Sequence, residues 1–265
     1  MTPESFHVKQ PAGQRPLPVV PLVDPPAGAA FELLSLMAEL GIAVTQEQAE
    51  QLAVHLQFVI EANKVAQLTS VTEFADGLIQ HVVDSALALP EVQRALAGPI
   101  ADLGSGGGFP GVPLAVLSDR DTLLVDSVSK KARLMEQYAR SAHRTGGRIS
   151  AFPGRAESLA RTDQRGSFAI VTARAVSQLP ALVELAAPLL SDGGDLIALK
   201  GDLSNDEKDR GDQVAALLGM RSVSFREYQL PRTGAKRTVV VYRRHGPLKV
   251  DLPRNEGQAQ HNPLA

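Results

Sequence analysis

The feature that most constrains this chain is a glycine-rich segment, DLGSGGGFPG, at residues 102–111. A short apolar run, PIADL, precedes it, and a helix opened by Pro110 and Pro113 follows it. Glycine lets the backbone turn sharply and lets a ligand approach with no Cβ in the way. A strand, a glycine-rich turn and a helix in this order are the context in which such a segment binds a ligand. The sequence therefore predicts a ligand-binding turn here, with a purely structural glycine turn as the alternative.

The region around this turn alternates between strand-like and helix-like patterns. Strands are expected at residues 99–103, 122–126, 148–152, 168–175, 195–201, 222–230 and 237–244. Helices between them are expected at residues 129–144, 179–190 (closed by Gly193 and Gly194) and 204–218. This alternation predicts a parallel sheet with right-handed crossovers, and the last two runs predict a β-hairpin that adds one antiparallel strand. The layout is that of a doubly wound, class I (Rossmann-like) methyltransferase α/β sheet, and not that of a dehydrogenase.

Four parts of the chain differ in composition and pattern. Residues 1–30 hold seven of the 18 prolines and are predicted to be a disordered arm, because proline fits neither helices nor central strands. Residues 31–98 show apolar residues at helical spacing and predict an N-terminal helical cap, with a capping box that begins at Thr45. Residues 99–245 are the predicted methyltransferase domain, and residues 246–265 are predicted to be a disordered polar tail.

The composition excludes several classes of chemistry. The chain has no cysteine, which removes disulfides, thiolate metal sites, iron–sulfur clusters and every mechanism with a cysteine nucleophile. Its six histidines show no metal-ligand spacing, so no metal is expected. No apolar run approaches the ~20 residues of a membrane span, and no signal-peptide pattern is present. We therefore expect a cytoplasmic monomer that does not associate with membranes.

Charge is distributed unevenly along the chain, although the formal net charge is only −2. Residues 1–100 carry 4 Lys or Arg and 11 Asp or Glu, a net charge of −7. The remaining residues carry 23 of the 27 basic and 18 of the 29 acidic side chains, a net charge of +5. An excess of positive charge in the C-terminal part suits binding to a polyanion, and solvated charge without a partner is the alternative.

The residues beside the glycine turn indicate which ligand it binds. Residues 106–111 also fit the G-x-G-x-x-G pattern, so NAD is an alternative. Asp102 can meet the ammonium group of a methionine moiety but would repel a pyrophosphate, and Pro110 lacks one of the N–H donors that hold a pyrophosphate. Asp126 ends the next strand, about twenty residues on, where it can accept hydrogen bonds from both ribose hydroxyls of an adenosine. These features favour S-adenosylmethionine as the cofactor.

Several motifs occur in order along the chain, and together they resemble a known family. They are DLGSGGGFPGVPLA, LVDSVSKKARLM, RAE at residues 155–157, ARAVSQL and IALKG, preceded by NKVAQLTSV at residues 63–71 and HVVDS at residues 81–85. In this combination, over about residues 31–244, the chain resembles the bacterial 16S rRNA guanine-N7 methyltransferases, also called glucose-inhibited division protein B. Gln67 and Ala62 depart from that family, which usually has Asn and Trp at these positions.

The resemblance implies an activity and a set of cofactor contacts. The activity is S-adenosylmethionine-dependent methylation of N7 of one guanine in 16S rRNA, as naked RNA or in the 30S particle. Cofactor contacts are expected at Gly104, Gly106, Phe109, Asp126, Ala156, Glu157 and Arg174. A small-molecule methyltransferase on the same fold and a non-catalytic or NAD-binding protein are the alternatives.

A second group of residues is a candidate for contacts to the substrate. His81, Asp84 and Ser85 share one face of a helix expected at about residues 78–89, and the resemblance makes this face a wall of the active site. A solvated helix face is the alternative. The remaining candidates are the basic side chains Lys200, Lys236 and Arg237, together with Lys130, Lys131 and Arg133 at the start of a helix and Arg243 and Arg244 at the end of the hairpin.

The chemistry expected of such an enzyme needs no general base. Guanine N7 carries an in-plane lone pair and no proton, so transfer requires only in-line alignment of N7, methyl and sulfur. Methylation of cytosine C5 is excluded because the chain lacks a cysteine nucleophile. Enzymes that methylate adenine N6 usually carry an Asn/Asp-Pro-Pro-aromatic motif after the fourth strand, where this chain has ARAV at residues 173–176. We therefore expect direct transfer without a catalytic acid or base.

Overall fold

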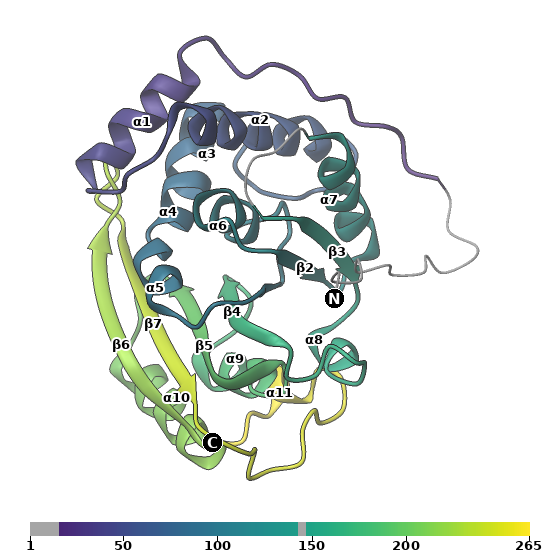
Figure 1. Ribbon diagram of the computed structural model, residues 1–265, viewed down its shortest axis with the longest axis vertical. Helices are drawn as coiled ribbons and strands as arrows, with labels where there is room; N and C mark the ends of the chain where they lie inside the picture. The colour runs from purple at the N-terminus through teal and green to yellow at the C-terminus, as the bar shows by residue number, and fades with distance from the viewer. Residues whose placement is uncertain (1–15, 143–146) are drawn as a thin grey trace.

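The computed structural model describes residues 16–142 and 147–265, and the parts of the predictions that concern residues 1–15 and 143–146 lie outside these ranges. At its centre is a seven-stranded sheet in the order β3-β2-β1-β4-β5-β7-β6 (Figure 1). β1 to β5 run parallel, and β7 is antiparallel to both β5 and β6. The strands are β1 (Ile100–Leu103), β2 (Thr122–Asp126), β3 (Ile149–Pro153), β4 (Phe168–Arg174), β5 (Leu190–Lys200), β6 (Met220–Gln229) and β7 (Lys236–Arg244). This confirms the predicted doubly wound sheet with its terminal hairpin.

Helices cover both faces of this sheet. Because side chains alternate along a strand, Leu124 of β2 packs in one core with α6 and α7, whereas Leu123 and Val125 pack in a second core with α8, α9 and α10. These helices are α6 (Gly111–Ser118), α7 (Ser129–Ser141), α8 (Ala156–Leu159), α9 (Leu179–Ala186) and α10 (Asn205–Leu217). Every helix predicted within the sheet domain is present, so the strand-to-helix alternation read from the sequence holds.

The residues before the sheet form a series of helices. These helices pack on the face of the sheet that α6 and α7 cover. They are α1 (Ala29–Glu39), α2 (Gln46–Asn63), α3 (Phe74–Gly77), a π-helix η1 (Leu78–Val83), α4 (Asp84–Ala86) and α5 (Leu89–Arg94). The predicted capping box opens α2: the Gln48 backbone N–H donates to Thr45 Oγ1 (3.1 Å) and the Thr45 N–H donates to Gln48 Oε1 (3.0 Å). α1 and α2 share one core with α6 and α7, so the boundary between cap and domain stays a prediction.

The fifth strand begins earlier than the sequence predicts. Gly193 and Gly194 were expected to close a helix that ends at residue 190, but α9 ends at Ala186 and both glycines lie inside β5. The register between β4 and β5 shifts at this point. Gly193 has a φ of +77°, and a Cβ on Gly194 would lie 3.0 Å from the Ala169 carbonyl oxygen. The two glycines therefore mark a bulge in a strand and not a helix end.

The described part of the N-terminal arm and the C-terminal tail both depart from the predicted disorder. Within the described part of the N-terminal arm, Val20 is buried and its N–H donates to Gln137 Oε1 of α7 (2.9 Å). The C-terminal residues 246–265 are packed as well: Leu252 and Ala259 are buried in the second core, and α11 (Gln258–His261) follows the last strand. The prediction of a disordered tail is thus wrong. Its apolar residues are too widely spaced to form a periodic pattern, and polar contacts hold most of the segment.

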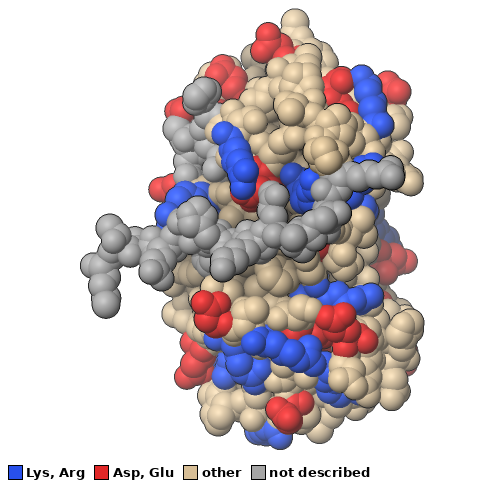
Figure 2. Space-filling view, turned by 90° about the vertical axis from the view of Figure 1, so that its right-hand side faces the viewer, with Lys and Arg blue, Asp and Glu red and all other residues tan. Residues whose placement is uncertain are grey.

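The surface mixes charges of both signs. On the face shown in Figure 2, Lys and Arg side chains lie beside Asp and Glu side chains. Ion pairs between exposed side chains include Arg148 with Asp121 (2.8 Å) and Arg140 with Glu136 (3.0 Å). In the part of the chain that the structure describes, no helix is both long and apolar enough to span a membrane.

Candidate active site

The glycine turn connects β1 to α6 and folds as the sequence predicts. Gly104, Gly106 and Gly108 have φ values of +65°, +54° and +85°, a region that favours glycine. The N–H groups of Gly104 and Ser105 both donate to the Val125 carbonyl oxygen, at 2.8 and 3.1 Å. The turn is therefore fixed against the end of β2.

Asp102 faces the interior and not a ligand. Its side chain is fully buried, where Oδ2 accepts from the Gly111 N–H (2.9 Å) and Oδ1 pairs with Thr172 Oγ1 (2.9 Å). Burial raises the pKa of Asp102 to about 7. The expectation that this carboxyl meets the ammonium group of a methionine is wrong, because its oxygens tie β1 to the start of α6 and to β4.

Asp126 lies at the carboxyl end of β2, directly beside the glycine turn. Its Oδ2 accepts from the Gly106 N–H (2.9 Å) and its Oδ1 accepts from the Val128 N–H (2.8 Å). These two bonds fix the orientation of the carboxylate. An ionised carboxylate has about four acceptor sites, so Asp126 keeps lone pairs for further donors.

A first cavity opens where the parallel strands end. Three of the expected cofactor residues line it, namely Gly104, Ala156 and Glu157, and so do Val176 after β4 and Gln260 of α11. The remaining expected residues, Gly106, Phe109, Asp126 and Arg174, are not among its lining residues. The sequence therefore predicted the carboxyl edge of the sheet correctly as the location of this cavity. It gave no signal for Gln260, which also lines the cavity.

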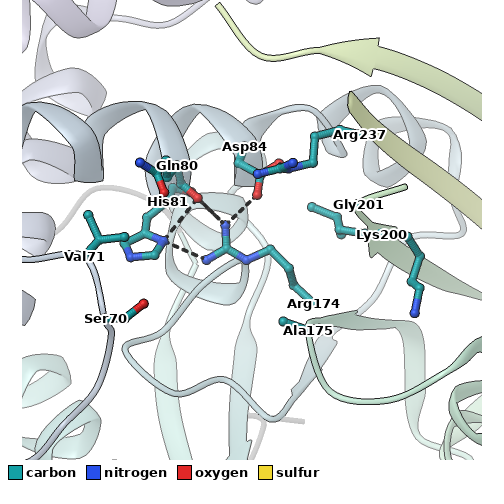
Figure 3. A pocket seen from close by; sticks show the side chains of 11 residues that line it. Ser70, Val71, Gln80, His81, Asp84, Arg174, Ala175, Lys200, Gly201 and Arg237 are labelled. Atoms are coloured by element: carbon teal, nitrogen blue, oxygen red, sulfur yellow. Dashed lines mark hydrogen bonds and ion pairs between the residues drawn. The ribbon is translucent and has the colours of Figure 1, made fainter. Parts of the chain in front are cut away.

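A second cavity of about 390 Å³ lies next to it (Figure 3). Its walls come from η1, from the loops after β4 and β5, and from the start of β7. Four expected substrate residues line it: His81, Asp84, Lys200 and Arg237. Ser85 does not, because it is buried and its hydroxyl donates to the His81 carbonyl oxygen (2.5 Å). Lys236 is exposed and lies outside the lining.

Asp84 is the centre of an ion-pair cluster in the second cavity. Its Oδ2 lies 2.9 Å from Nη1 of Arg174, and its Oδ1 lies 2.9 Å from Nε of Arg237. Figure 3 shows the two guanidinium groups converging on this carboxylate. Two cations around one anion give this wall a net positive charge. The alternative of a solvated helix face is therefore wrong for Asp84, which is only 5% exposed in its side chain.

His81 lies in the π-helical turn and stays neutral. Burial, followed by the charge of Arg174, lowers the pKa of His81 to about 4. Arg174 Nη2 lies 3.2 Å from His81 Nδ1, which also lies 3.1 Å from the Gln80 carbonyl oxygen, and His81 Nε2 lies 2.6 Å from Thr69 Oγ1. The imidazole also stacks on Phe109, with ring centroids 4.8 Å apart. Phe109 thus supports the second cavity from behind.

Lys200 is held away from the centre of the second cavity. Its ammonium group lies 2.7 Å from Glu207 Oε1 and donates to the Ser177 carbonyl oxygen (2.9 Å). Figure 3 shows this side chain pointing away from Arg174. Its charge is therefore neutralised in place. Among the described residues, no group of three or more His, Cys, Asp or Glu side chains could hold a metal ion.

Two further residues, His55 and Asn63, support the site through hydrogen bonds. His55 of α2 is fully buried, with Nε2 2.9 Å from the Gly107 carbonyl oxygen, and burial lowers its pKa to about 3. Asn63 Oδ1 accepts from the N–H groups of Leu68 (2.7 Å) and Thr69 (3.1 Å), which positions Thr69 beside His81. A single histidine at a helical core position carries no signal in one sequence, whereas Asn63 belongs to the family-like motif noted above.

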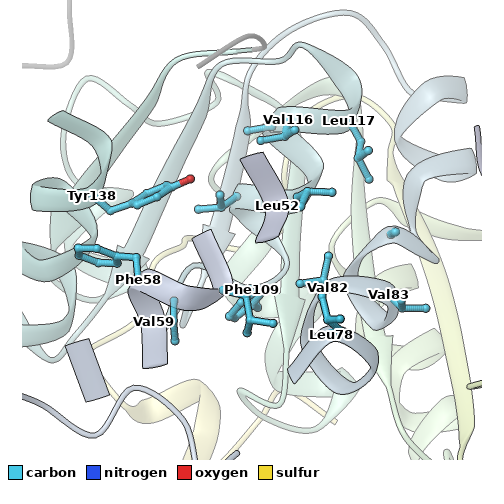
Figure 4. Close-up of a cluster of buried hydrophobic side chains, with 14 of the residues drawn as sticks. Leu52, Phe58, Val59, Leu78, Val82, Val83, Phe109, Val116, Leu117 and Tyr138 are labelled. Atoms are coloured by element: carbon cyan, nitrogen blue, oxygen red, sulfur yellow. The ribbon is translucent and has the colours of Figure 1, made fainter. Parts of the chain in front are cut away.

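The helices around these residues form a well-packed support. Figure 4 shows Phe58 and Val59 of α2, Val82 of η1 and Phe109 of the glycine turn in one cluster of buried side chains. Because the cap contributes His81 and Asp84 and the sheet contributes Arg174, this shared core fixes their relative positions.

Consecutive residues directly after β4 line the two cavities. Arg174 and Ala175 line the second cavity, and the next residue, Val176, lines the first. Ala175 has a φ of +56°, which is uncommon for a residue other than glycine and often occurs at functional sites. This turn lets successive residues face two different cavities.

Comparisons with known proteins agree on one family. A family model described as rRNA small subunit methyltransferase G matches residues 48–237. The ribosomal RNA small subunit methyltransferase G of Deinococcus radiodurans is 37% identical over 90% of this chain and 94% of its own length. That of Pelotomaculum thermopropionicum is 33% identical over 85% of this chain and 95% of its own length.

Solved structures resemble the chain more distantly. A SAM-dependent methyltransferase from Methanosarcina mazei has a TM-score of 0.47 at 17% identity, covering 59% of this chain and 97% of that chain. The family model spans more than half of this chain, and the relatives match it over nearly their full length. The chain is therefore a methyltransferase that belongs to the rRNA small subunit methyltransferase G family.

Proposed function

We propose that this enzyme methylates N7 of one guanine in the 16S rRNA of the small ribosomal subunit, in the cytoplasm. The relatives are named for the RNA of the small subunit, which supports an RNA substrate. The observation that carries the proposal is the pair of cavities lined by consecutive residues after β4, one at the carboxyl edge of the sheet and one with a positively charged wall. One cavity suits the methyl donor and the other suits a nucleotide.

S-adenosylmethionine is the methyl donor, and when bound it supplies an electrophilic methyl group. We assign its adenosine to the first cavity, where Gly104 and Ala156 present no large side chains. Asp126 is fixed by two backbone donors and has lone pairs left for the ribose hydroxyls. In this proposal Ala156 and Glu157 lie beside the adenine. A side chain on Gly104 would meet Val176, since a Cβ there lies 2.5 Å from Val176 Cγ2.

The second cavity suits a guanine and its phosphate. Guanidinium groups donate to guanine O6 and to phosphate oxygens, and Arg174 and Arg237 both line this cavity. Arg174 is also packed over Phe109 of the glycine turn, 5.6 Å from the ring centroid. A base held against Arg174 would thus lie next to Ala175, and the residue after it, Val176, lines the first cavity.

The side chains of the second cavity can orient a guanine, but none of them is placed to act as a general base. Asp84 is paired with two guanidinium groups, so its carboxylate is committed to them. His81 Nδ1 lies 3.2 Å from Nη2 of Arg174. Both groups therefore fix the arginines. This arrangement agrees with direct transfer to guanine N7, which has no proton to remove and needs only alignment.

The position of the methyl group is the claim to test. The 16S rRNA methylated by the enzyme is reduced with borohydride and treated with aniline, which cleaves the strand at 7-methylguanosine. We expect cleavage at one guanine, and none in RNA incubated without S-adenosylmethionine. Methylated RNA that is not cleaved, or label found in adenosine or cytidine, would overturn the assignment to N7 and leave methyl transfer itself intact.

A further inference from the structure

The segment that follows the last strand reaches back to the cofactor edge of the sheet. Gln260 of α11 lines the first cavity together with Gly104 and Ala156. The family model ends at residue 237, so this segment lies outside the matched region. Figure 1 shows the chain running from the end of β7 past α9 to α11. Residues 252–262 are called the C-terminal segment below.

Two buried carboxylates anchor the C-terminal segment to the sheet domain. Arg254 forms a bidentate pair with Glu184 of α9, with both N–O distances at 2.6 Å. The N–H of Gly257 donates to Glu157 Oε1 (2.7 Å). Glu157 and Glu184 are 5% and 3% exposed, and a buried carboxylate is stable only when it is paired or hydrogen-bonded. Both acids therefore depend on this segment.

Further contacts fix the backbone on either side of Gln260. Arg165 donates to the Leu252 carbonyl oxygen (2.6 Å), and Arg254 donates to the carbonyl oxygen of Asn262 (2.7 Å). Gly257 has a φ of +77°, which turns the chain into α11. Gln260 thus lies between Gly257 and Asn262, which are both held by hydrogen bonds, and its position does not depend on a free chain end.

We propose that the C-terminal segment is part of the cofactor site and that the Gln260 carboxamide hydrogen-bonds the edge of the adenine. This inference rests on the proposed placement of the adenosine in the first cavity. A carboxamide offers one acceptor and two donors, which matches an adenine edge with its amino donor and ring-nitrogen acceptor. Glu157, which lines the same cavity, has one oxygen engaged by Gly257, so Gln260 supplies an uncharged partner beside it.

The test is calorimetric titration of the full-length protein with S-adenosylhomocysteine. Gln260→Ala should weaken binding by roughly 5- to 100-fold, because the purine edge loses a hydrogen-bond partner. Gln258→Ala is the matched control, since Gln258 belongs to the same helix and does not line the cavity. It should leave the affinity unchanged. Unchanged binding by Gln260→Ala would overturn the proposal.

A second ligand separates a contact from a merely structural effect. S-inosylhomocysteine carries an oxygen in place of the adenine amino group. If Gln260 hydrogen-bonds the adenine amino group, Gln260→Ala should weaken binding of the adenosyl ligand more than that of the inosyl ligand. The preference of the enzyme for the adenosyl ligand should then fall by about the same factor as its affinity for S-adenosylhomocysteine. An equal loss for both ligands would show that Gln260 only supports the fold. Failure of the wild-type protein to bind either ligand would instead contradict the proposed placement of the cofactor.

Discussion

Three buried side chains around the glycine turn have pKa values that burial shifts away from their usual range. Burial raises the pKa of Asp102 to about 7, and it lowers the pKa of His81 to about 4 and that of His55 to about 3. The Asp102 contribution to stability is present below its unfolded pKa of 3.8 and is lost as the pH rises toward 7. The histidine contributions have the opposite sign, since they are present above pH 6.5 and are lost as the pH falls.

The substitution Asp102→Asn isolates the first of these effects. An amide can still accept from the Gly111 N–H and can donate to Thr172 Oγ1, but it never ionises. The free energy of unfolding of Asp102→Asn relative to wild type should therefore rise between pH 4 and 7, by up to about 1.4 kcal/mol per pH unit, and level off above. Urea denaturation at several pH values measures it. A difference that is flat or falls with pH would contradict the buried, proton-binding carboxyl.

The hairpin of β6 and β7 is the element that joins the N-terminal helices to the sheet at the second cavity. Arg237 of β7 pairs with Asp84, and Arg226 of β6 pairs with Glu91 of α5 (2.5 Å). The wall of this cavity therefore combines an arginine from the antiparallel end of the sheet with an acid from the cap. We therefore expect a change in the hairpin to affect the proposed substrate cavity and not the first cavity.

Arg237→Gln tests this division between the two cavities. It leaves Asp84 with one guanidinium and removes a cation from the cavity wall. The kcat/KM for RNA should fall by roughly tenfold to a hundredfold, as expected when a charged hydrogen bond is lost, while the affinity for S-adenosylhomocysteine stays unchanged. Arg221→Gln, on the exposed part of β6, is the charge-matched control and should leave both values unchanged. Equal activity of the two variants would remove Arg237 from the substrate site.

The elements that could be predicted from the sequence are those with a regular pattern. The five parallel strands, the hairpin and the capping box at Thr45 all follow local rules of periodicity and side-chain chemistry. The π-helical turn that carries His81 has no such pattern, because its wider turn is imposed by packing in the shared core. The roles of Asp102 and Gln260 depend on residues far away in sequence, Thr172 and Gly104 among them, so a single sequence carries no signal for them.

At the scale of the whole molecule, much of the positive charge is used internally. Arg254 and Arg243 form ion pairs with Glu184 and Asp195, both of which are buried. Arg226 and Arg232 also pair with Glu91 and Glu32 of the first 100 residues, so the net charge of +5 after residue 100 overstates what is available to RNA. Exposed cations near the second cavity, such as Lys236, remain the candidates for phosphate contacts.

Lys236→Gln should weaken RNA binding in a salt-dependent manner. One phosphate contact changes the slope of log K against log salt by about 0.7 to 0.9, so the slope of the variant should be shallower by that amount. Lys249→Gln, also exposed but located beyond the other end of β7, should retain the wild-type slope. Filter binding of 16S rRNA over a range of salt concentrations measures both. Identical slopes for wild type and Lys236→Gln would place Lys236 outside the RNA interface.

Removal of the C-terminal segment should destabilise the enzyme, contrary to what the sequence pattern suggests. A chain that ends at residue 250 leaves Glu157 and Glu184 without their partners and exposes the apolar surface under Leu252. Breaking one buried ion pair costs about 3–5 kcal/mol, so we expect the melting temperature to fall by at least about 5 °C. Differential scanning calorimetry measures it. A melting temperature equal to that of the full chain would show that the segment is dispensable for folding.

The central claim is that this enzyme methylates small-subunit rRNA and uses the two cavities to do so. Transfer of labelled methyl groups tests it most directly. Tritiated S-adenosylmethionine is incubated with the enzyme and with 16S rRNA, 30S particles or 23S rRNA. The RNA and the particles come from cells that lack the gene for this enzyme. The account predicts incorporation of about one methyl group per 16S rRNA molecule, in the naked RNA or in the particle, and none in 23S rRNA. Absence of label from 16S rRNA in both forms, with S-adenosylhomocysteine still bound, would contradict it.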